Sequence, residues 1–343
     1  MTSRGYTVLG PEIVKQLHDP RRDFAYDVLV GLSEKPKRLS SKYFYDDAGS
    51  AYFRRIMALP EYYPTACEEA ILTRHADAIV APALGAPLNL VDLGAGDGKK
   101  TMIVLEALRR AGADFVYVPI DISEGAMREL VEKVRASMPD VRVEGLVAEY
   151  TDGVHHLARA AGERANLVLF LGSNIGNFGR VAANAFLRKL WSALRPRDHV
   201  LVGFDLKKDI EVLLAAYNDR AGVTAAFNLN LLHRINRELG ADFDVSRFRH
   251  FGTYNVFSGA MESYLVSLEP QLVSIAALEL SFAFDAWEPL HTEYSYKYLR
   301  SDVARLAAGT GFAIELELED ERGWFLDSLW RVRSTIEAPE PER

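Results

Sequence analysis

The sequence predicts an α/β fold: a mostly parallel β-sheet flanked by helices, together with a second lobe. Three observations predict it. Short apolar segments alternate with helical patterns over residues 88–204, which is typical of parallel strands joined by helices. The first of these segments ends in a glycine-rich turn. Beyond residue 206 the alternation stops, and longer helical and strand-like segments follow, so a second structural unit is expected there.

Five apolar segments have the length and composition of buried strands. They occupy residues 88–93, 115–121, 141–147, 167–171 and 199–204. Helical patterns are expected between several of them, at residues 100–111, 123–138 and 182–194. Because helices separate these strands along the chain, the strands should run parallel, with helices on both faces of the sheet.

The last part of the chain is expected to contain two helices, two further strands and a terminal hairpin. The helices are expected at 209–237 and 296–308, the strands at 261–268 and 278–284, and the hairpin strands at 312–318 and 324–332. The hairpin is predicted because charged residues and a glycine at 319–323 separate two apolar segments. Such an antiparallel hairpin would complete the parallel sheet.

The first 75 residues mix helical stretches with aromatic segments. Pro60 and Pro64 bracket a Glu-Tyr-Tyr triplet, and Pro64 disfavours a helical conformation for Tyr63. We therefore expect a loop over residues 59–65.

These patterns divide the chain into two expected lobes. Residues 67–207 and 297–335 should form the sheet domain, and residues 1–66 and 208–296 the second lobe. The tail, 336–343, is expected to be disordered.

Composition and charge exclude several classes of protein. The 343-residue chain has 40 basic and 48 acidic residues, a net charge of −8 and no long basic stripe, so a nucleic-acid partner is not expected. No apolar run reaches the roughly 18 residues of a membrane span, and a signal-peptide core is lacking, so we expect a cytoplasmic protein without membrane contact. Cys67 alone cannot form an internal disulfide, and no metal site is expected. A monomer that binds a small molecule is the simplest expectation.

The first predicted strand ends in the turn Gly-Ala-Gly-Asp-Gly, which begins at Gly94. Glycines permit a sharp turn and let a ligand approach the amide groups at a helix start. The turn is not a dinucleotide fingerprint, because Lys99 stands where that pattern requires glycine or alanine. It is not a phosphate-binding loop either, because the required Gly-Lys-Ser/Thr ending is absent. A plain tight turn remains the alternative.

Acidic residues follow the next two predicted strands. Asp121 ends the second strand, where a carboxylate can accept both ribose hydroxyls of a nucleoside. Glu149 follows the third strand beside Tyr150, whose ring could pack on adenine. A single acidic residue for the ribose, without a phosphate-binding loop, favours S-adenosylmethionine over a dinucleotide. Lys100 could pair with the methionine carboxylate of that cofactor. As alternatives, Asp121 could cap a helix and Lys100 could be a solvated residue of a first helical turn.

Several long motifs resemble the histidine Nα-methyltransferases of ergothioneine biosynthesis, in order, from about residue 25 to 333. The motifs are Lys-Tyr-Phe-Tyr-Asp at 42–46, Leu-Pro-Glu-Tyr-Tyr-Pro-Thr at 59–65, Phe-Leu-Gly-Ser-Asn-Ile-Gly-Asn at 170–177, Tyr-Asn-Asp at 217–219, Gly-Val-Thr-Ala-Ala-Phe-Asn at 222–228 and Thr-Glu-Tyr-Ser at 292–295. The resemblance implies a Rossmann-like class I methyltransferase sheet with a second, substrate-binding lobe.

The resemblance also implies a role for individual residues. The residues implied to hold S-adenosyl-L-methionine are Gly94, Lys100, Asp121, Glu149 and Tyr150. Tyr45 would lie where donor and acceptor meet. The residues implied to hold the amino and carboxylate ends of the substrate are Tyr62, Asn177 and Tyr217.

Glu293 and Ser295 are implied to take the two imidazole nitrogens. Residues two apart on a strand share a face, which suits a ring with two nitrogens. Alternatively, both line a solvent face while Tyr294 and Tyr296 face the core. Tyr45 and Tyr62 could likewise be half-buried loop aromatics, and Asn177 could simply end a turn.

The expected activity is therefore successive Nα-methylation of L-histidine to its trimethyl betaine, hercynine. Two departures from the family pattern bear on this. Glu149-Tyr150 replaces a common Asp-Phe pair, and Ser263 falls where some relatives carry methionine against the imidazole. An Nα-methyltransferase of another aromatic amino acid is one alternative, and an adenosyl-binding scaffold without catalytic activity is another. A methyltransferase for protein or nucleic acid fits the acidic composition poorly.

Overall fold

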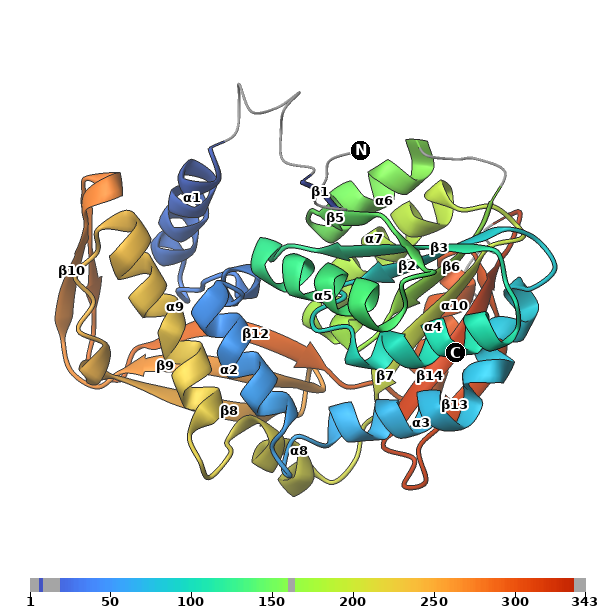
Figure 1. Cartoon of the computed structure of the whole chain (residues 1–343). Coiled ribbons are helices and arrows are strands. Elements are labelled where there is room, and N and C mark those ends of the chain that lie inside the picture. The colour runs from blue at the N-terminus through green and yellow to red at the C-terminus, as the bar shows by residue number, and fades with distance from the viewer. Residues whose placement is uncertain (1–5, 9–18, 160–163, 336–343) are drawn as a thin grey trace. The chain divides into compact units, whose positions relative to one another are not determined.

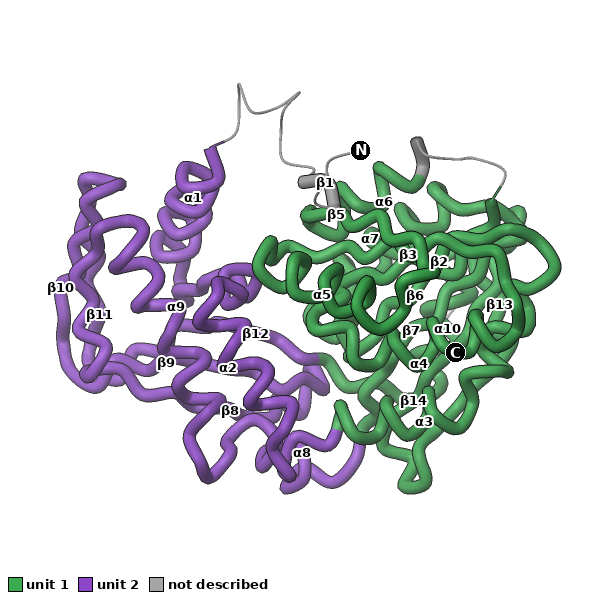
Figure 2. The backbone as a smooth tube through the Cα atoms, viewed as in Figure 1, with its two compact units in different colours: residues 1–10, 64–207, 296–343 green, residues 11–63, 208–295 purple. Residues whose placement is uncertain are grey.

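The computed structural model describes residues 6–8, 19–159 and 164–335, and its elements are labelled in Figure 1. The chain divides into two compact units, which Figure 2 shows in different colours. Unit 1 comprises residues 1–10, 64–207 and 296–343, and unit 2 comprises residues 11–63 and 208–295. The tail expected to be disordered, 336–343, lies outside the described residues.

Within its described residues, unit 1 contains a nine-stranded sheet in the order β1-β5-β3-β2-β6-β7-β14-β13, with β4 also paired to β3. Its strands are β1 Tyr6–Val8, β2 Leu88–Leu93, β3 Phe115–Asp121, β4 Arg142–Val143, β5 Gly145–Val147, β6 Ala165–Phe170, β7 His199–Asp205, β13 Phe312–Glu319 and β14 Phe325–Val332. Strands β1 to β7 pair in parallel, whereas β14 is antiparallel to both β7 and β13. The expected parallel sheet with a terminal hairpin is thus confirmed.

Helices cover both faces of this sheet. The helices of unit 1 are α3 Tyr63–Val80, whose first residue belongs to unit 2, α4 Lys99–Arg110, α5 Glu124–Ser137, α6 Tyr150–Arg159, α7 Arg180–Ala193 and α10 Arg300–Gly309, with short 3₁₀ turns η2 Ala81–Ala83 and η3 Asn174–Asn177. Neighbouring residues of one strand join different cores: Leu90 packs with α3, α4 and α5, and Val91 packs with α6, α7 and α10. Burial on both sides explains why the strands are apolar throughout.

Unit 2 combines helices with two small antiparallel sheets. Its three-stranded sheet has the order β12-β9-β8, and β10 pairs with β11. Its strands are β8 Phe248–Asn255, β9 Ala260–Ser267, β10 Gln271–Ile275, β11 Leu280–Phe284 and β12 Pro289–Tyr296, whose last residue belongs to unit 1. Its helices are α1 Pro20–Ser33, α2 Asp47–Met57, α8 Ile210–Tyr217 and α9 Val223–Leu239, with 3₁₀ turns η1 Ser41–Phe44, η4 Val245–Arg247 and η5 Ala276–Leu278. A separate core, which includes Phe44, Phe227 and Leu265, holds them together.

The structure corrects the expected elements at several points. Residues 6–8, expected in the second lobe, form strand β1 of the unit 1 sheet, paired with β5. The segment expected as one strand at 141–147 is interrupted at Glu144. Tyr63 is helical despite Pro64, because proline is tolerated within the first turn of a helix. Strands β8 and β10 were missed, since β8 contains Arg249, His250 and Gly252 rather than an apolar run.

Two helix predictions were also too long. The helix expected at 209–237 is two helices, because Asp219 accepts the backbone N–H groups of Val223 and Thr224 and begins α9 anew. The helix expected at 296–308 begins only at Arg300, since Tyr296 still belongs to β12 and the backbone of Tyr298 bonds to Asp205.

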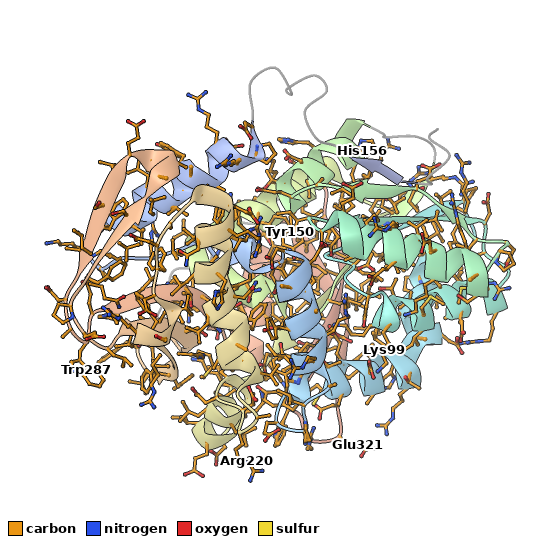
Figure 3. The ribbon with its side chains drawn as sticks, turned by 60° about the vertical axis from the view of Figure 1, so that its left-hand side comes forward. Lys99, Tyr150, His156, Arg220, Trp287 and Glu321 are labelled. Carbon is orange, nitrogen blue, oxygen red and sulfur yellow. The ribbon has the colours of Figure 1, made fainter. Side chains whose placement is uncertain are left out.

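The buried indole of Trp330 provides a stability test. Trp330 lies on β14 between the rings of Phe204 and Phe312, with centroids at 5.8 and 5.4 Å, and donates to Ser328 Oγ at 2.8 Å. Trp330→Ala should lower the free energy of unfolding by about 3–5 kcal/mol, because it leaves a large cavity. The measurement is urea unfolding followed by circular dichroism. Trp287→Ala is the control: Trp287 is exposed (Figure 3), so a change within about 0.5 kcal/mol is expected.

Candidate functional site

The glycine turn after β2 is tied to the end of β3. Gly94, Gly96 and Gly98 all have left-handed backbone angles, with φ of 79°, 54° and 65°, which glycine adopts at little cost. The Asp121 carboxylate accepts the N–H groups of Gly96 and Ser123, both at 2.9 Å. Burial raises the pKa of Asp121 above its ordinary value, against the effect of these two donors. One carboxylate thus fixes two neighbouring strand ends.

Tyr150 and Asn174 lie close to the first glycine of the turn. A Cβ atom at Gly94 would stand 2.7 Å from the Tyr150 hydroxyl and 2.8 Å from Asn174 Nδ2, so a larger residue would collide with both. The Tyr150 ring packs edge-on against Phe170 at 5.3 Å, among the aromatic side chains of the core (Tyr150 is labelled in Figure 3). Its hydroxyl, with an edge of the ring, therefore meets the turn. Glu149 is exposed, and its backbone carbonyl accepts N–H groups at the start of α6.

Lys100 stands in the first turn of α4 and pairs with a buried acid. Its Nζ atom forms an ion pair with Glu68 of α3, and both Glu68 oxygens accept the Gly172 N–H, at 2.8 and 2.9 Å. Burial by itself would lower the pKa of Lys100, but the charge of Glu68 raises it above its ordinary value. Lys100 is thus already engaged, rather than the solvated residue of the alternative interpretation.

Asp92 lies on β2, two residues before the glycine turn, and is a second buried acid near Lys100. Its carboxylate accepts the hydroxyls of Thr101 at 2.6 Å and Tyr117 at 3.0 Å. Burial raises the pKa of Asp92 to about 6, against the effect of these donors. Asp92 therefore joins the start of α4 to β2 and links β2 to β3.

The substrate residues expected in unit 2 form a continuous row of contacts. Tyr45 and Tyr62 both meet Phe53 edge-on, with ring centroids at 5.6 and 6.3 Å. Tyr62 also meets Tyr217, at 6.4 Å, and the Tyr217 hydroxyl donates to Ser295 Oγ at 2.7 Å. Unit 2 thus brings four expected residues together. Phe53 was missed from the sequence, because nothing in α2 distinguishes it from a core aromatic.

The remaining expected residues lie as follows. Ser295 is buried and Glu293 half-buried on β12, while Tyr294 is 38% exposed, so the alternative that turned Tyr294 into the core is wrong. Ser263 is buried on β9, and its carbonyl accepts the Thr292 hydroxyl at 3.0 Å. Asn177 ends η3 and belongs to unit 1.

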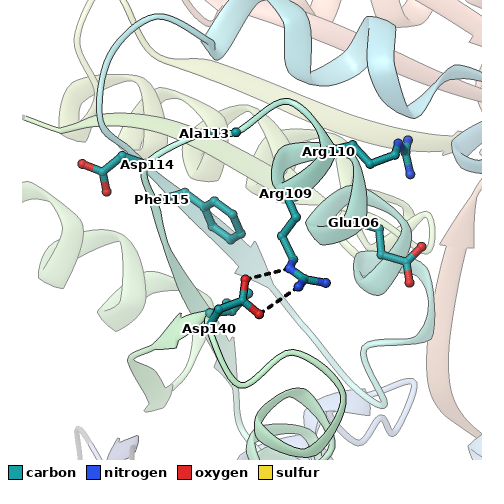
Figure 4. Close-up of a pocket in the computed structure, with 9 residues that line it drawn as sticks. Glu106, Arg109, Arg110, Ala113, Asp114, Phe115 and Asp140 are labelled. Atoms are coloured by element: carbon teal, nitrogen blue, oxygen red, sulfur yellow. Dashed lines mark hydrogen bonds and ion pairs between the residues drawn. The ribbon is translucent and has the colours of Figure 1, made fainter.

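A surface cavity lies near the amino-terminal end of β3, at the opposite end of this strand from Asp121. It has a volume of about 700 Å³ and borders Phe115, the first residue of β3, with Arg109 and Asp140 joined by two hydrogen bonds of 2.9 Å (Figure 4). Its lining includes none of the residues singled out above. Among the described residues, no group of three or more His, Cys, Asp and Glu side chains could hold a metal ion. No described helix is both long and apolar enough to cross a membrane.

The parallel sheet closed by an antiparallel hairpin, with a glycine turn tied to Asp121, is the Rossmann-like architecture expected of an S-adenosylmethionine-dependent methyltransferase. More narrowly, the chain belongs to the family of histidine-specific, S-adenosylmethionine-dependent methyltransferases, which matches residues 24–332. Both the expected family and the expected cofactor are thus confirmed, and the chain is an enzyme rather than a scaffold.

Three relatives illustrate the similarity. The histidine N-alpha-methyltransferase of Mycolicibacterium smegmatis is 40% identical over 285 residues, which cover 83% of this chain and 87% of that protein. The enzyme of the same name from Mycobacterium tuberculosis is 39% identical over 303 residues, covering 88% and 93%. Ergothioneine biosynthesis protein 1 of Neurospora crassa is 32% identical over 281 residues, covering 80% of this chain and 31% of that protein.

The Asp121 carboxylate is the sharpest test of the cofactor site. Asp121→Ala should weaken S-adenosylmethionine binding by roughly a hundredfold or more, because hydrogen bonds to a charged group are lost. Asp121→Asn keeps an acceptor oxygen and should lie between the alanine variant and the unmodified protein. Isothermal calorimetry measures the affinity. The control is Asp114→Ala, an exposed position just before the other end of β3, which should bind normally. Normal binding by Asp121→Ala would remove this strand end from the cofactor site.

Proposed function

We propose that this chain transfers methyl groups from S-adenosylmethionine to the α-amine of L-histidine, in three rounds that end at the trimethyl betaine hercynine. The observation that carries the proposal is the row from Tyr45 through Tyr62 and Tyr217 to Ser295, in a chain of a histidine-specific family. Relatives at 40% and 39% identity bear the name histidine N-alpha-methyltransferase, which supports the same substrate.

We assign the cofactor to unit 1 and most of the substrate contacts to unit 2. In unit 1, Asp121 would accept the ribose hydroxyls, and Lys100 would pair with the methionine carboxylate. Gly94 would belong to the same site, because the absence of a side chain there lets the turn approach Tyr150 and Asn174 closely. Glu149 and Tyr150 would border the adenine. The substrate-binding role of unit 2, residues 11–63 and 208–295, follows from its aromatic row.

The reaction is an in-line displacement in which the protein mainly positions the acceptor. When bound, the cofactor would supply an electrophilic methyl group on its sulfonium, with the S–CH₃ bond breaking as the N–CH₃ bond forms. The amine must therefore present a neutral lone pair, so one proton would pass from it to water before each transfer. Tyr45, Tyr62 and Tyr217 would orient the amine, with ring faces that stabilise the cationic product. Asn177 would hold the carboxylate end of the amino acid.

Histidine would be recognised through its two ring nitrogens. Glu293 would accept the imidazole N–H, and Ser295 would bond to the other nitrogen. The Ser295 oxygen accepts from Tyr217, so the hydroxyl group is held in one place beside the aromatic row. A site that hydrogen-bonds a polar ring rejects apolar rings strongly, because they leave its polar groups unpaired.

The proposal also covers the location and the oligomeric state of the chain. With a net charge of −8, the chain is suited to a small zwitterionic substrate rather than to nucleic acid, and we propose that it works as a cytoplasmic monomer. Sedimentation equilibrium would reveal a dimer if this part is wrong.

Substrate competition tests the assignment to histidine. In a mixture of the twenty amino acids with S-adenosylmethionine, mass spectrometry should find mono-, di- and trimethylhistidine as the main products. Glu293→Ala should lower kcat/KM for histidine by roughly 10- to 100-fold, because a hydrogen bond to a charged group is lost. The same variant should show a smaller preference for histidine over phenylalanine. Glu269→Ala, an exposed acid paired with Arg247 in the same unit, is the control. If tryptophan or tyrosine outruns histidine, another aromatic amino acid is the substrate and Ser263 is the first position to examine.

The contact between Tyr217 and Ser295 gives a finer test. Tyr217→Phe removes one hydrogen bond, so KM for histidine should rise about 2- to 10-fold while the affinity for S-adenosylmethionine stays unchanged. Steady-state kinetics provides the first value and calorimetry the second. Tyr26→Phe alters an exposed tyrosine of α1 and should change neither. An unaltered KM in Tyr217→Phe would contradict the substrate role of this contact.

A further inference from the structure

Unit 1 buries an acid that makes none of the contacts described above. Asp327, on β14, is fully buried, and within the described part of the chain neither of its carboxylate oxygens has a hydrogen-bond partner. Its cross-strand neighbour on β7 is Gly203. A Cβ atom at Gly203 would overlap Glu68 Oε1 and stand 3.2 Å from Asp327 Oδ1. The missing side chain of Gly203 therefore makes room for two carboxyl groups that approach one another.

The charges in this cluster do not balance if both acids are ionised. Glu68 and Asp327 are fully buried, and Lys100, with 20% of its side chain exposed, is the cation paired with Glu68. Asp92 of β2 adds a third acid whose charge acts on Lys100. An uncompensated buried carboxylate is costly, so it retains its proton instead. Burial and the charge of Glu68 hold the pKa of Asp327 well above its usual range.

We propose that Glu68 and Asp327 hold one proton between them, on Asp327, and that this pair positions the Lys100 ammonium group for the carboxylate end of the cofactor. Protonated Asp327 has an O–H to donate, and Glu68, which shares the space beside Gly203, would accept it. Ionised Glu68 keeps its two other partners, Lys100 Nζ and the Gly172 N–H. Glu68 and Asp327 act through Lys100 and are therefore positioning residues.

The shared proton limits repulsion when the cofactor binds. When Asp327 is neutral, the charges of Lys100 and Glu68 cancel. The incoming carboxylate of the cofactor then meets only the charge of Asp92. With Asp327 ionised, the same carboxylate would meet an additional buried negative charge. The location suits this role, because Lys100 follows β2, Gly172 follows β6, and ligands bind at the carboxyl ends of such neighbouring parallel strands.

Infrared difference spectroscopy tests the proton directly. The unmodified protein should show the C=O stretching band of a protonated carboxyl group that is missing from Asp327→Asn. The band should also vanish in Glu68→Gln, because Asp327 can then ionise and become the partner of Lys100. Absence of the band from the unmodified protein, or its persistence in Glu68→Gln, would overturn the shared proton.

Calorimetry with S-adenosylhomocysteine tests the positioning. Asp327→Asn mimics the protonated acid and should bind within about twofold of the unmodified protein, whereas Glu68→Gln should bind roughly tenfold or more weakly. Glu69→Gln is the matched control, since Glu69 is the next residue of α3 and pairs with the exposed Lys99 (labelled in Figure 3). In Glu68→Gln, KM for S-adenosylmethionine should rise while kcat stays within about twofold, which general damage to the fold would not produce. Equal loss in Asp327→Asn and Glu68→Gln, or none in Glu68→Gln, would contradict the proposal.

The inference rests on the proposed pairing of Lys100 with the cofactor, and one variant separates the two. Lys100→Met should weaken S-adenosylhomocysteine binding at least as much as Glu68→Gln. If Lys100→Met binds normally, Lys100 is not a cofactor residue and the positioning role falls with it. The infrared result stands independently of that outcome, because it reports only where the proton lies.

Discussion

The Asp121 carboxylate accepts N–H groups from Gly96 and Ser123 and thereby joins the end of β3 to the turn that follows β2. Much of unit 1 depends on this tie. It holds the turn in the left-handed conformation from which α4 starts, and α4 in turn carries Lys100 toward Glu68. The same acid thus serves the fold and, in the proposed function, the cofactor. A site built from strand ends in this way is already ordered before a ligand arrives, which reduces the entropy cost of binding.

The sheet of unit 1 was predictable because its strands are buried on both faces. Segments such as Leu88–Leu93 and Ala165–Phe170 are mainly apolar, and a glycine follows each within two residues of its end. Unit 2 was less predictable for the opposite reason. Strand β8 alternates buried with half-buried and exposed positions and contains Arg249 and His250, so its pattern resembles a loop. The break between α8 and α9 depends on the side chain of Asp219, whose effect appears only in three dimensions.

The site residues of unit 1 were likewise easier to predict from sequence patterns than those of unit 2. Gly94 and Asp121 could be singled out from their positions at strand ends. Tyr45 and Tyr217 came only from the resemblance to a family, since no spacing rule connects residues so distant in the chain. Glu68, Asn174 and Asp327 were missed altogether. Glu68 meets Gly172 across 104 residues, and an acid within an otherwise ordinary helix gives no local sign that it is buried.

The position of β14 has a consequence for how the protein is made. In the sheet, β14 lies between β7 and β13, although it is the last of the described strands along the chain. On the ribosome, β7 therefore emerges long before the neighbour that covers its outer edge, with all of residues 208–295 synthesised in between. Exposed strand edges invite wrong pairing in nascent chains. A chain released before residue 325 would lack an interior strand rather than a peripheral one, so premature termination is especially damaging to this topology.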